Sequence, residues 1–311
     1  MKSDLIIAQT TNRTREQLIR LQNLPLEQKI NLTLRRIQQF CTARGNKVYV
    51  AFSGGKDSTV VLDLVRKIYP EAQAVFCDTG LEFPEIRKFV EGTPNTVFLK
   101  PKLTFLQVID KYGYPVISKE NSQKIHEIRT THSDKLRNKR LFGDEKGNGK
   151  LAKKWNFAIE APFKISHKCC DIMKKNPSKS FEKKTGLAPI TGEMASESRL
   201  REGSWLKTGC NQYSGRVKST PLSFWTDADI WEYIKKYRLP YSDIYNMGYK
   251  RTGCVYCLFG AQFDNDAGRG KFDLLKKTHP KLYSYCMENL GIKEIFKFFD
   301  KNTKLVNSKY K

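Results

Sequence analysis

The chain has 311 residues, of which 56 are lysine or arginine and 32 are aspartate or glutamate, so its formal net charge at pH 7 is +24. No apolar run approaches the ~18 residues that a membrane helix needs, and the N-terminus lacks the architecture of a secretory signal. We therefore expect a cytoplasmic protein without membrane contact. The excess of cations favours a polyanionic partner, with nucleic acid the first candidate. Eight cysteines in a reducing compartment indicate metal or redox chemistry rather than a disulfide framework.

The first 44 residues are expected to form a helical N-terminal segment. Leucine and isoleucine recur at helical spacing between residues 10 and 44, which predicts one or two helices before the first strand. Arginines make this segment basic, and a solvated face is the simpler interpretation of such charges.

A strand, a glycine turn and a helix follow one another at residues 48–68. Val48 to Phe52 reads as a short buried strand, Ser53, Gly54 and Gly55 permit a tight turn, and Ser58 to Ile68 has the spacing of an amphipathic helix. The free N–H groups and the dipole at a helix N-terminus attract anions. Lys56 adds a positive charge to these donors. The stretch therefore predicts a phosphate site.

Strands and helices alternate over the next part of the chain. This alternation predicts an α/β fold with a mostly parallel sheet and helices on both faces. Ligands in such sheets lie beyond the carboxyl ends of the strands, so loop 53–58 and residues 78–80 are expected on one rim. Further strands are predicted at 74–77, 96–99 and 187–190, and further helices at 85–91, 104–112 and 227–237.

Residues 119–184 break this alternation and read as a basic insertion, in which 125–140 is predicted to form a helix. Two interpretations of this insertion are equally good, and the first is a solvated basic face. In the second, its cations and aromatic residues bind single-stranded nucleic acid by phosphate contact and stacking. The aromatic candidates are Trp155, Phe157 and Phe163.

The chain is expected to divide into three consecutive regions. Residues 1–44 form the helical segment, 45–260 the nucleotide-binding domain with its insertion, and 261–311 a helical C-terminal region. Within the last region we expect two helices, at 273–290 and 293–299, followed by a basic tail.

The loop Ser53-Gly-Gly-Lys-Asp-Ser58 lacks the GxxxxGK[ST] spacing of mononucleotide P-loops. It resembles the SGGKDS loop of the PP-loop ATP pyrophosphatases, which bind the β,γ-pyrophosphate of ATP, usually with Mg²⁺, and direct chemistry to the α-phosphorus. Three further segments resemble the phosphoadenosine phosphosulfate (PAPS) reductase family of that superfamily. These segments are Asp78-Thr-Gly80 with Phe83-Pro-Glu85, Thr191 to Arg201, and Pro221 to Tyr241.

This resemblance implies a set of site residues. Lys56, Asp57 and Asp78 would be catalytic, and Asp78 would hold Mg²⁺ or orient the nucleotide. Glu193 and Glu197 are candidates for a general base, although none is identified. The implied nucleotide ligands are Ser53, Gly54, Gly55, Lys56, Asp57, Ser58, Thr79, Gly80, Arg199 and Arg201.

Four cysteines form a CC…CxxC set: Cys169, Cys170, Cys254 and Cys257. A CxxC turn can present two thiolates to one metal or cluster, whereas an adjacent pair is a strained chelate for one zinc ion but can reach two corners of a cubane. The set resembles the [4Fe–4S] ligands of the adenosine phosphosulfate reductases and of the DNA-phosphorothioation enzyme of the same fold. Zinc, free thiols and a redox disulfide are the alternatives.

One departure from the family pattern guides the choice of activity. Sulfonucleotide reductases carry a C-terminal Cys-Gly-x-His tail whose thiolate attacks the sulfonucleotide sulfur, and no cysteine follows Cys286 here. The iron–sulfur reductases with this cysteine set also usually have a degenerate phosphate loop, whereas loop 53–58 is intact. These differences favour an enzyme that adenylates an acceptor with ATP, releases pyrophosphate and then transfers sulfur.

The expected acceptor is a nucleic acid, and a sulfur-donor protein such as a cysteine desulfurase is a possible partner. The first alternative is a PAPS or adenosine phosphosulfate (APS) reductase of sulfur assimilation with an unusual thiol donor. The second is a nucleotide-sensing regulator without turnover. The acceptor, the sulfur donor and the oligomeric state are not determined by the sequence.

Overall fold

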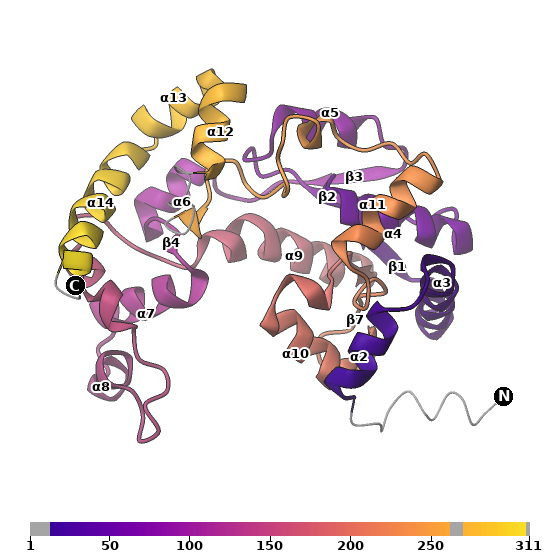
Figure 1. Ribbon diagram of the computed structural model, residues 1–311, viewed down its shortest axis with the longest axis horizontal. Coiled ribbons are helices and arrows are strands. Elements are labelled where there is room, and N and C mark those ends of the chain that lie inside the picture. Colours follow the sequence, from indigo (N-terminus) through magenta and orange to yellow (C-terminus); the bar gives the residue numbers. More distant parts are fainter. Residues whose placement is uncertain (1–12, 262–269, 309–311) are drawn as a thin grey trace. The chain divides into compact units, whose positions relative to one another are not determined.

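The computed structural model describes residues 13–261 and 270–308, and the chain forms two compact units (Figure 1). Unit 1 comprises Met1–Cys77, Pro84–Leu99 and Ser178–Tyr245, and unit 2 comprises Asp78–Phe83, Lys100–Pro177 and Asn246–Lys311. Each unit is thus built from separate stretches of sequence, and the region 45–260 contributes to both. Among the described residues, no helix has the length and apolar character required to span a membrane.

Unit 1 contains a six-stranded sheet in the order β3-β2-β1-β5-β7-β6. Its pairs are parallel except for β6 and β7, which are antiparallel. The α/β fold with a mostly parallel sheet is therefore confirmed. The strands are β1 (Val48–Ala51), β2 (Ala74–Cys77), β3 (Thr96–Leu99), β5 (Ala188–Ile190), β6 (Asn211–Gln212) and β7 (Lys218–Ser219).

The central strand β1 is buried on both faces, as expected for the middle of a parallel sheet. Tyr49 meets Phe181 of α9 (Asn176–Thr185) edge to face and donates to Glu182 of the same helix at 2.8 Å. Because side chains alternate along a strand, Val48 and Val50 point to the opposite face. The strand is apolar throughout because helices cover both of its faces.

Three helices of unit 1 pack against one another: α3 (Leu26–Ala43), α4 (Lys56–Ile68) and α11 (Asp227–Lys236). Lys29 of α3 is 2% exposed and donates to both oxygens of Asp229 in α11, at 2.7 and 2.6 Å. This buried ion pair joins α3 to the start of α11. The remaining elements of unit 1 are α2 (Arg15–Gln22), α5 (Pro84–Glu91), η3 (Ala195–Glu197), α10 (Arg199–Thr208) and η4 (Asp243–Tyr245).

Unit 2 is mainly helical and has a small parallel sheet formed by β4 (Val116–Ile117) and β8 (Leu258–Phe259). Its aromatic residues gather where η1 (Lys153–Glu160) packs on α14 (Ile292–Ser308), and Phe157 contacts both Phe298 and Phe299. The other elements are α6 (Phe105–Tyr112), α7 (Lys119–Thr130), α8 (Asp134–Phe142), η2 (Asp171–Lys175), α12 (Gly270–Thr278) and α13 (Pro280–Glu288).

Two predicted helices are each divided in two, and the helix predicted at 293–299 is longer than expected, because α14 runs from Ile292 to Ser308. The helix expected at 125–140 is two helices, α7 and α8, because Ser133 caps a new helix by accepting from the Leu136 amide at 3.3 Å. The helix expected at 273–290 divides into α12 and α13 at His279–Pro280. A proline lacks the N–H that a continuing helix requires, so it begins α13 instead. The three helices α12, α13 and α14 can be followed in succession in Figure 1.

Candidate functional site

Loop 53–58 lies where the sequence predicted it, between β1 and α4, but the helix begins two residues earlier, at Lys56. Gly54 has φ +71°, and a Cβ there would lie 2.7 Å from Val90 Cγ2 and 2.9 Å from Ile86 Cγ2. Both its left-handed backbone and the close approach of α5 therefore require glycine. Gly55 is the N-cap of α4 and makes no side-chain cap, so the first turn of the helix keeps donors available for an anion.

Serine and threonine hydroxyls hold the loop in this shape. Ser58 Oγ donates to the Gly55 carbonyl at 2.8 Å and accepts from the Ser53 amide at 3.2 Å, and Thr59 Oγ1 donates to the same carbonyl at 3.1 Å. The Ser53 and Ser58 hydroxyls are 3.1 Å apart. The turn is thus fixed by its own side chains, which is the preorganisation that an anion site needs.

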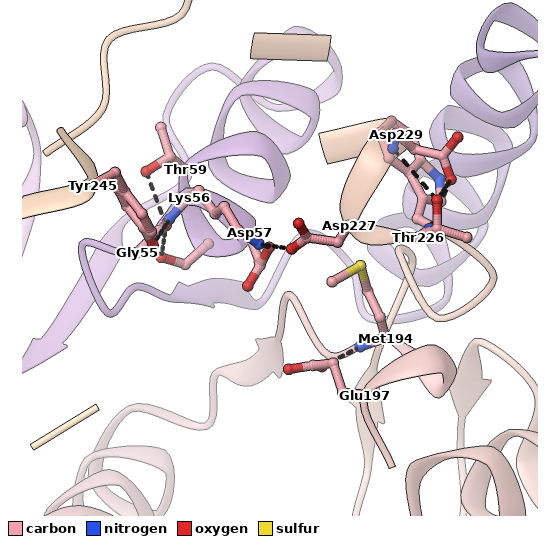
Figure 2. Close-up of polar contacts among 12 residues, drawn as sticks. Gly55, Lys56, Asp57, Thr59, Met194, Glu197, Thr226, Asp227, Asp229 and Tyr245 are labelled. Atoms are coloured by element: carbon pink, nitrogen blue, oxygen red, sulfur yellow. Dashed lines mark hydrogen bonds and ion pairs between the residues drawn. The ribbon is translucent and has the colours of Figure 1, made fainter. Parts of the chain in front are cut away.

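Lys56 is held by two carboxylates. Its Nζ lies 2.6 Å from Asp57 Oδ1 and 2.6 Å from Asp227 Oδ1, and its side chain is 5% exposed. Figure 2 shows the ammonium between these two groups, one from its own helix and one from the start of α11. Burial acts to lower the pKa of Lys56, but the hydrogen bonds to Asp227 and Asp57 outweigh it and raise that pKa, so the lysine is a cation.

The backbone of Lys56 has a further partner that the sequence did not reveal. Its N–H donates to the Tyr245 hydroxyl of η4 at 2.8 Å (Figure 2). This amide is the first of helix α4 and is one of the donors that a bound phosphate would use. The Tyr245 hydroxyl therefore lies at the edge of the candidate anion site.

The start of α11 is built rigidly around Asp229. Thr226 and Asp229 form a reciprocal capping box, in which Asp229 Oδ2 accepts from the Thr226 amide at 2.7 Å. The same carboxylate binds the buried ammonium of Lys29. Asp227 is the first residue of this fixed helix, so its position beside Lys56 follows from the cap.

The carboxyl end of β5 also reaches the loop. Gly192 follows the strand, and a Cβ there would lie 2.9 Å from both the carbonyl carbon and the carbonyl oxygen of Asp57. The preceding residue, Thr191, has a buried hydroxyl oxygen without a hydrogen-bond partner in the described part of the chain. The segment after β5 is thus packed directly on the backbone of loop 53–58.

The arginines and glutamates that follow β5 are engaged with other groups. Arg201 forms an ion pair with Glu197, whose carboxylate also accepts from the Met194 amide at 2.8 Å (Figure 2). Glu193 pairs with Lys218 at 3.0 Å. Arg199 is exposed at the start of α10. The roles predicted for these residues in phosphate neutralisation and proton transfer stay predictions.

The predicted ligands Asp78, Thr79 and Gly80 belong to unit 2, where their segment contacts the CxxC turn. The Val255 amide, between Cys254 and Cys257, donates to the Leu81 carbonyl at 2.7 Å. Thr79 donates from its hydroxyl to Glu82 at 2.7 Å, which fixes the loop after β2. This segment therefore supports the cysteine cluster, and its role toward a nucleotide stays a prediction.

The four cysteines of the CC…CxxC set come together in unit 2. Burial raises the pKa of the Cys169 thiol, and the neighbouring thiolates of Cys170, Cys254 and Cys257 raise it further. Cys169 is 7% exposed, and the other three are half-buried. Between residues 13–261 and 270–308, no three His, Cys, Asp or Glu side chains are arranged to hold a single metal ion. The four thiols thus converge without forming a single-ion site.

Lys174, from η2, is one of the cations beside these thiols, together with Lys119 and Lys271. Burial acts to lower the pKa of its ammonium, but the Cys254 thiolate and the Glu82 carboxylate outweigh that effect and raise it. Its Nζ lies 3.8 Å from the Glu82 oxygen. The sequence analysis did not identify this lysine, because it is one of many in the insertion. The pattern that could have identified it is its spacing of four residues from Cys170, which is about one helical turn.

Comparison with known proteins agrees with the segments quoted from the sequence. Residues 47–258 match the family described as the phosphoadenosine phosphosulfate reductase domain. The chain is 28% identical over 241 residues to the adenosine 5'-phosphosulfate reductase of Geobacillus kaustophilus, covering 77% of this chain and 84% of that protein. It is 26% identical to the enzyme of the same name from Halalkalibacterium halodurans, covering 84% and 94% of the two chains.

A solved structure of phosphoadenylyl-sulfate (PAPS) reductase from Candida auris, a phosphate complex, also aligns. It covers 79% of this chain and 97% of the other at 19% identity, with a TM-score of 0.41.

These relatives correct the predicted activity. The expectation of ATP-dependent adenylation of a nucleic acid is wrong, because the relatives over most of this chain are named as sulfonucleotide reductases. The misleading features were the net charge and the missing C-terminal cysteine, neither of which identifies a substrate. Because the family model matches residues 47–258, which is most of the chain, the chain belongs to the phosphoadenosine phosphosulfate reductase family of the PP-loop superfamily.

Proposed function

We propose that this protein is a sulfonucleotide reductase that binds an adenylyl sulfate through loop 53–58. The observation that carries the proposal is the preorganised anion site at the N-terminus of α4, with the cation Lys56 buried beside it. Curated relatives named adenosine 5'-phosphosulfate reductase support the substrate class. The loop would hold the phosphate of the nucleotide, and the sulfate carried by that phosphate would be reduced.

The reaction requires two thiols. A thiolate attacks the sulfur of the sulfonucleotide, the bond from that sulfur to the phosphate oxygen breaks, and the nucleoside phosphate leaves. A second thiol then attacks the sulfur of the first thiol, which releases sulfite and forms a disulfide. The two thiols supply the two electrons that reduce the sulfate sulfur. Lys56 and the helix N-terminus stabilise the negative charge that grows on the departing phosphate.

The first thiol in this proposal comes from a separate donor molecule. Burial raises the pKa of Cys41 to about 11 and that of Cys286 to about 12, so both are thiols rather than thiolates at neutral pH. Cys169 and Cys170 also have raised pKa values, with burial the largest cause. We propose a dithiol reductant or a thiol protein as the nucleophile in place of these thiols.

The direct test is sulfite release from adenosine 5'-phosphosulfate with dithiothreitol as the thiol, on anaerobically purified protein. We expect release that depends on the sulfonucleotide, and we expect Lys56→Ala to reduce it by about 100-fold or more. A matched control is Lys67→Ala, on the exposed side of the same helix. Pyrophosphate release from ATP without sulfite release from the sulfonucleotide would refute the proposal.

We further propose that Cys169, Cys170, Cys254 and Cys257 hold a [4Fe–4S] cluster. Four converging thiols are the ligand set of such a cluster, and a cubane spreads its four ligands more widely than one ion does. When bound, the cluster would keep the four thiols deprotonated and would supply an iron–sulfur centre in unit 2.

The cluster can be tested without an activity assay. Anaerobically purified protein should show visible iron–sulfur absorbance and contain about four iron and four sulfide per chain. Cys257→Ser should lose both, whereas Cys210→Ser, outside the set, should retain them. A colourless protein that contains zinc would contradict this assignment.

A further inference from the structure

We propose that Asp227 is a positioning residue of the anion site: its carboxylate holds Lys56 until a phosphate group arrives and replaces it. Asp57 keeps its contact with Lys56 when the anion binds. The inference rests on the proposed function only in taking loop 53–58 as the phosphate site. According to this inference, the affinity of the site for an anion depends on the exchange of the Asp227 carboxylate for one phosphate oxygen at Lys56.

The charges around Lys56 require such an exchange. One ammonium is bound by two carboxylates, each at 2.6 Å, so the three groups together carry one negative charge. A phosphate group that approached this set unchanged would be repelled. Because the Lys56 side chain is only 5% exposed, it has little free surface for a third oxygen. One carboxylate must therefore leave before the phosphate can bind Lys56.

Asp57 is the carboxylate that stays. It belongs to the first turn of α4, where the helix dipole stabilises a negative charge. Its side chain is 29% exposed, and its backbone is held by the close contact with Gly192. Moving Asp57 would disturb the loop that binds the anion.

Asp227 is the carboxylate that can leave. Its side chain is 69% exposed, so it returns to water with little loss of contact. Its release leaves α11 intact, because the capping box and the ion pair to Lys29 are made by Thr226 and Asp229. The freed carboxylate still lies in the first turn of α11, where the helix dipole favours it.

This arrangement predicts an unusual direction of effect. If Asp227 competes with the ligand, Asp227→Asn should tighten anion binding, by about three- to tenfold. If the residue were only structural, the same substitution would weaken binding or leave it unchanged. The conservative Asp227→Glu should restore the competing charge and return the affinity to about the wild-type value.

The experiment is calorimetric titration of the full chain with adenosine 5'-phosphosulfate and, separately, with inorganic pyrophosphate. Glu232→Gln is the matched control, because it removes one negative charge from an exposed position of the same helix. We expect a lower Kd in Asp227→Asn for both probes, and values within about twofold of wild type in Glu232→Gln. In the sulfite assay, KM for the sulfonucleotide should fall and kcat should not rise.

The outcomes separate this inference from the proposed function. An unchanged or higher Kd in Asp227→Asn, with wild-type circular dichroism, would overturn the inference, as would an equal gain in Glu232→Gln. Failure of every variant to bind either probe would overturn it together with the phosphate site. Tighter binding of pyrophosphate by Asp227→Asn in a protein that releases no sulfite would support the inference and remove the proposed function.

Discussion

The anion loop of unit 1 and the cysteine cluster of unit 2 differ in how their charges are compensated. The loop combines neutral backbone and hydroxyl donors with one cation, Lys56, which two carboxylates already bind. The cluster gathers four thiols, and burial, together with neighbouring thiolates, raises the pKa of Cys169, Cys170 and Cys257. Lys174 is a half-exposed cation beside them, and it also interacts with Glu82.

We infer from this difference that the two sites depend on their ligands to different degrees. The loop is held by hydrogen bonds within the protein and can adopt its shape before an anion arrives. Burial disfavours the thiolate forms of Cys169, Cys170 and Cys257, and the proposed metal centre would replace their protons. The loop is therefore held in its shape by the protein alone, whereas the proposed cluster would be completed by the group that it binds.

The largest expected effect concerns the buried ion pair between Lys29 and Asp229, at the start of α11. Asp229→Ala leaves the ammonium of Lys29 buried without its partner, and we expect a loss of about 3–5 kcal/mol in the free energy of unfolding. Urea denaturation in a reducing buffer measures it.

The accompanying variants identify the cause. Lys29→Met in the Asp229→Ala background should recover part of the stability, because it removes the unpaired charge. Glu232→Gln on the same helix should change stability by less than about 0.5 kcal/mol. If Asp229→Ala lowered the free energy of unfolding by no more than Glu232→Gln does, the ion pair between Lys29 and Asp229 would not be a buried, stabilising contact.

A smaller effect tests how closely the loop is packed. Gly192→Ala places a Cβ 2.9 Å from the carbonyl group of Asp57, and backbone atoms cannot move aside cheaply. We expect a loss of about 1–3 kcal/mol and weaker anion binding. The matched control is Gly203→Ala in α10, where a Cβ meets nothing within 4 Å and alanine should stabilise the helix by about 0.5–1 kcal/mol. Equal effects of the two substitutions would show that the segment after β5 does not constrain the loop.

Features contained in one short stretch of sequence could be predicted. The strands at 74–77 and 96–99 were predicted with their observed bounds, because short, mainly apolar runs mark strands of a parallel sheet, although β3 at the sheet edge is only half-buried. The loop was evident because its glycines, serines and Lys56 are contiguous. The four cysteines that spacing and resemblance grouped lie near one another, although they come from two distant segments, and their role as ligands stays a prediction.

Features that depend on distant contacts could not be predicted. Tyr245 binds the Lys56 amide across 189 residues, and Asp227 had no signal beyond its place at a helix start. The two units interleave along the chain, so no composition shift marks their boundaries. The activity was misjudged because net charge reports on the whole surface, whereas the substrate is chosen by a few donors at one loop.

The smallest expected effect concerns Glu127 in unit 2. Hydrogen-bond partners stabilise its charged form, whereas burial disfavours the charged form of the thiols in that unit. Glu127 of α7 accepts from Arg140 Nε of α8 at 2.5 Å and from Gln123 at 2.8 Å. Burial acts to raise the pKa of Glu127, but these bonds outweigh it and lower the pKa. A carboxylate with a lowered folded-state pKa stabilises the protein above its unfolded pKa, about 4.3, and this contribution disappears as the pH falls through the folded value.

Glu127→Gln should therefore cost about 0.5–1 kcal/mol at pH 7, and the difference from wild type should shrink as the pH falls below about 4. Urea denaturation at several pH values measures it. Glu294→Gln, whose exposed ion pair with Lys297 lies in α14 of the same unit, should cost less than about 0.3 kcal/mol at any pH. A cost for Glu127→Gln that is constant with pH would show that packing, not the paired charge, joins α7 to α8.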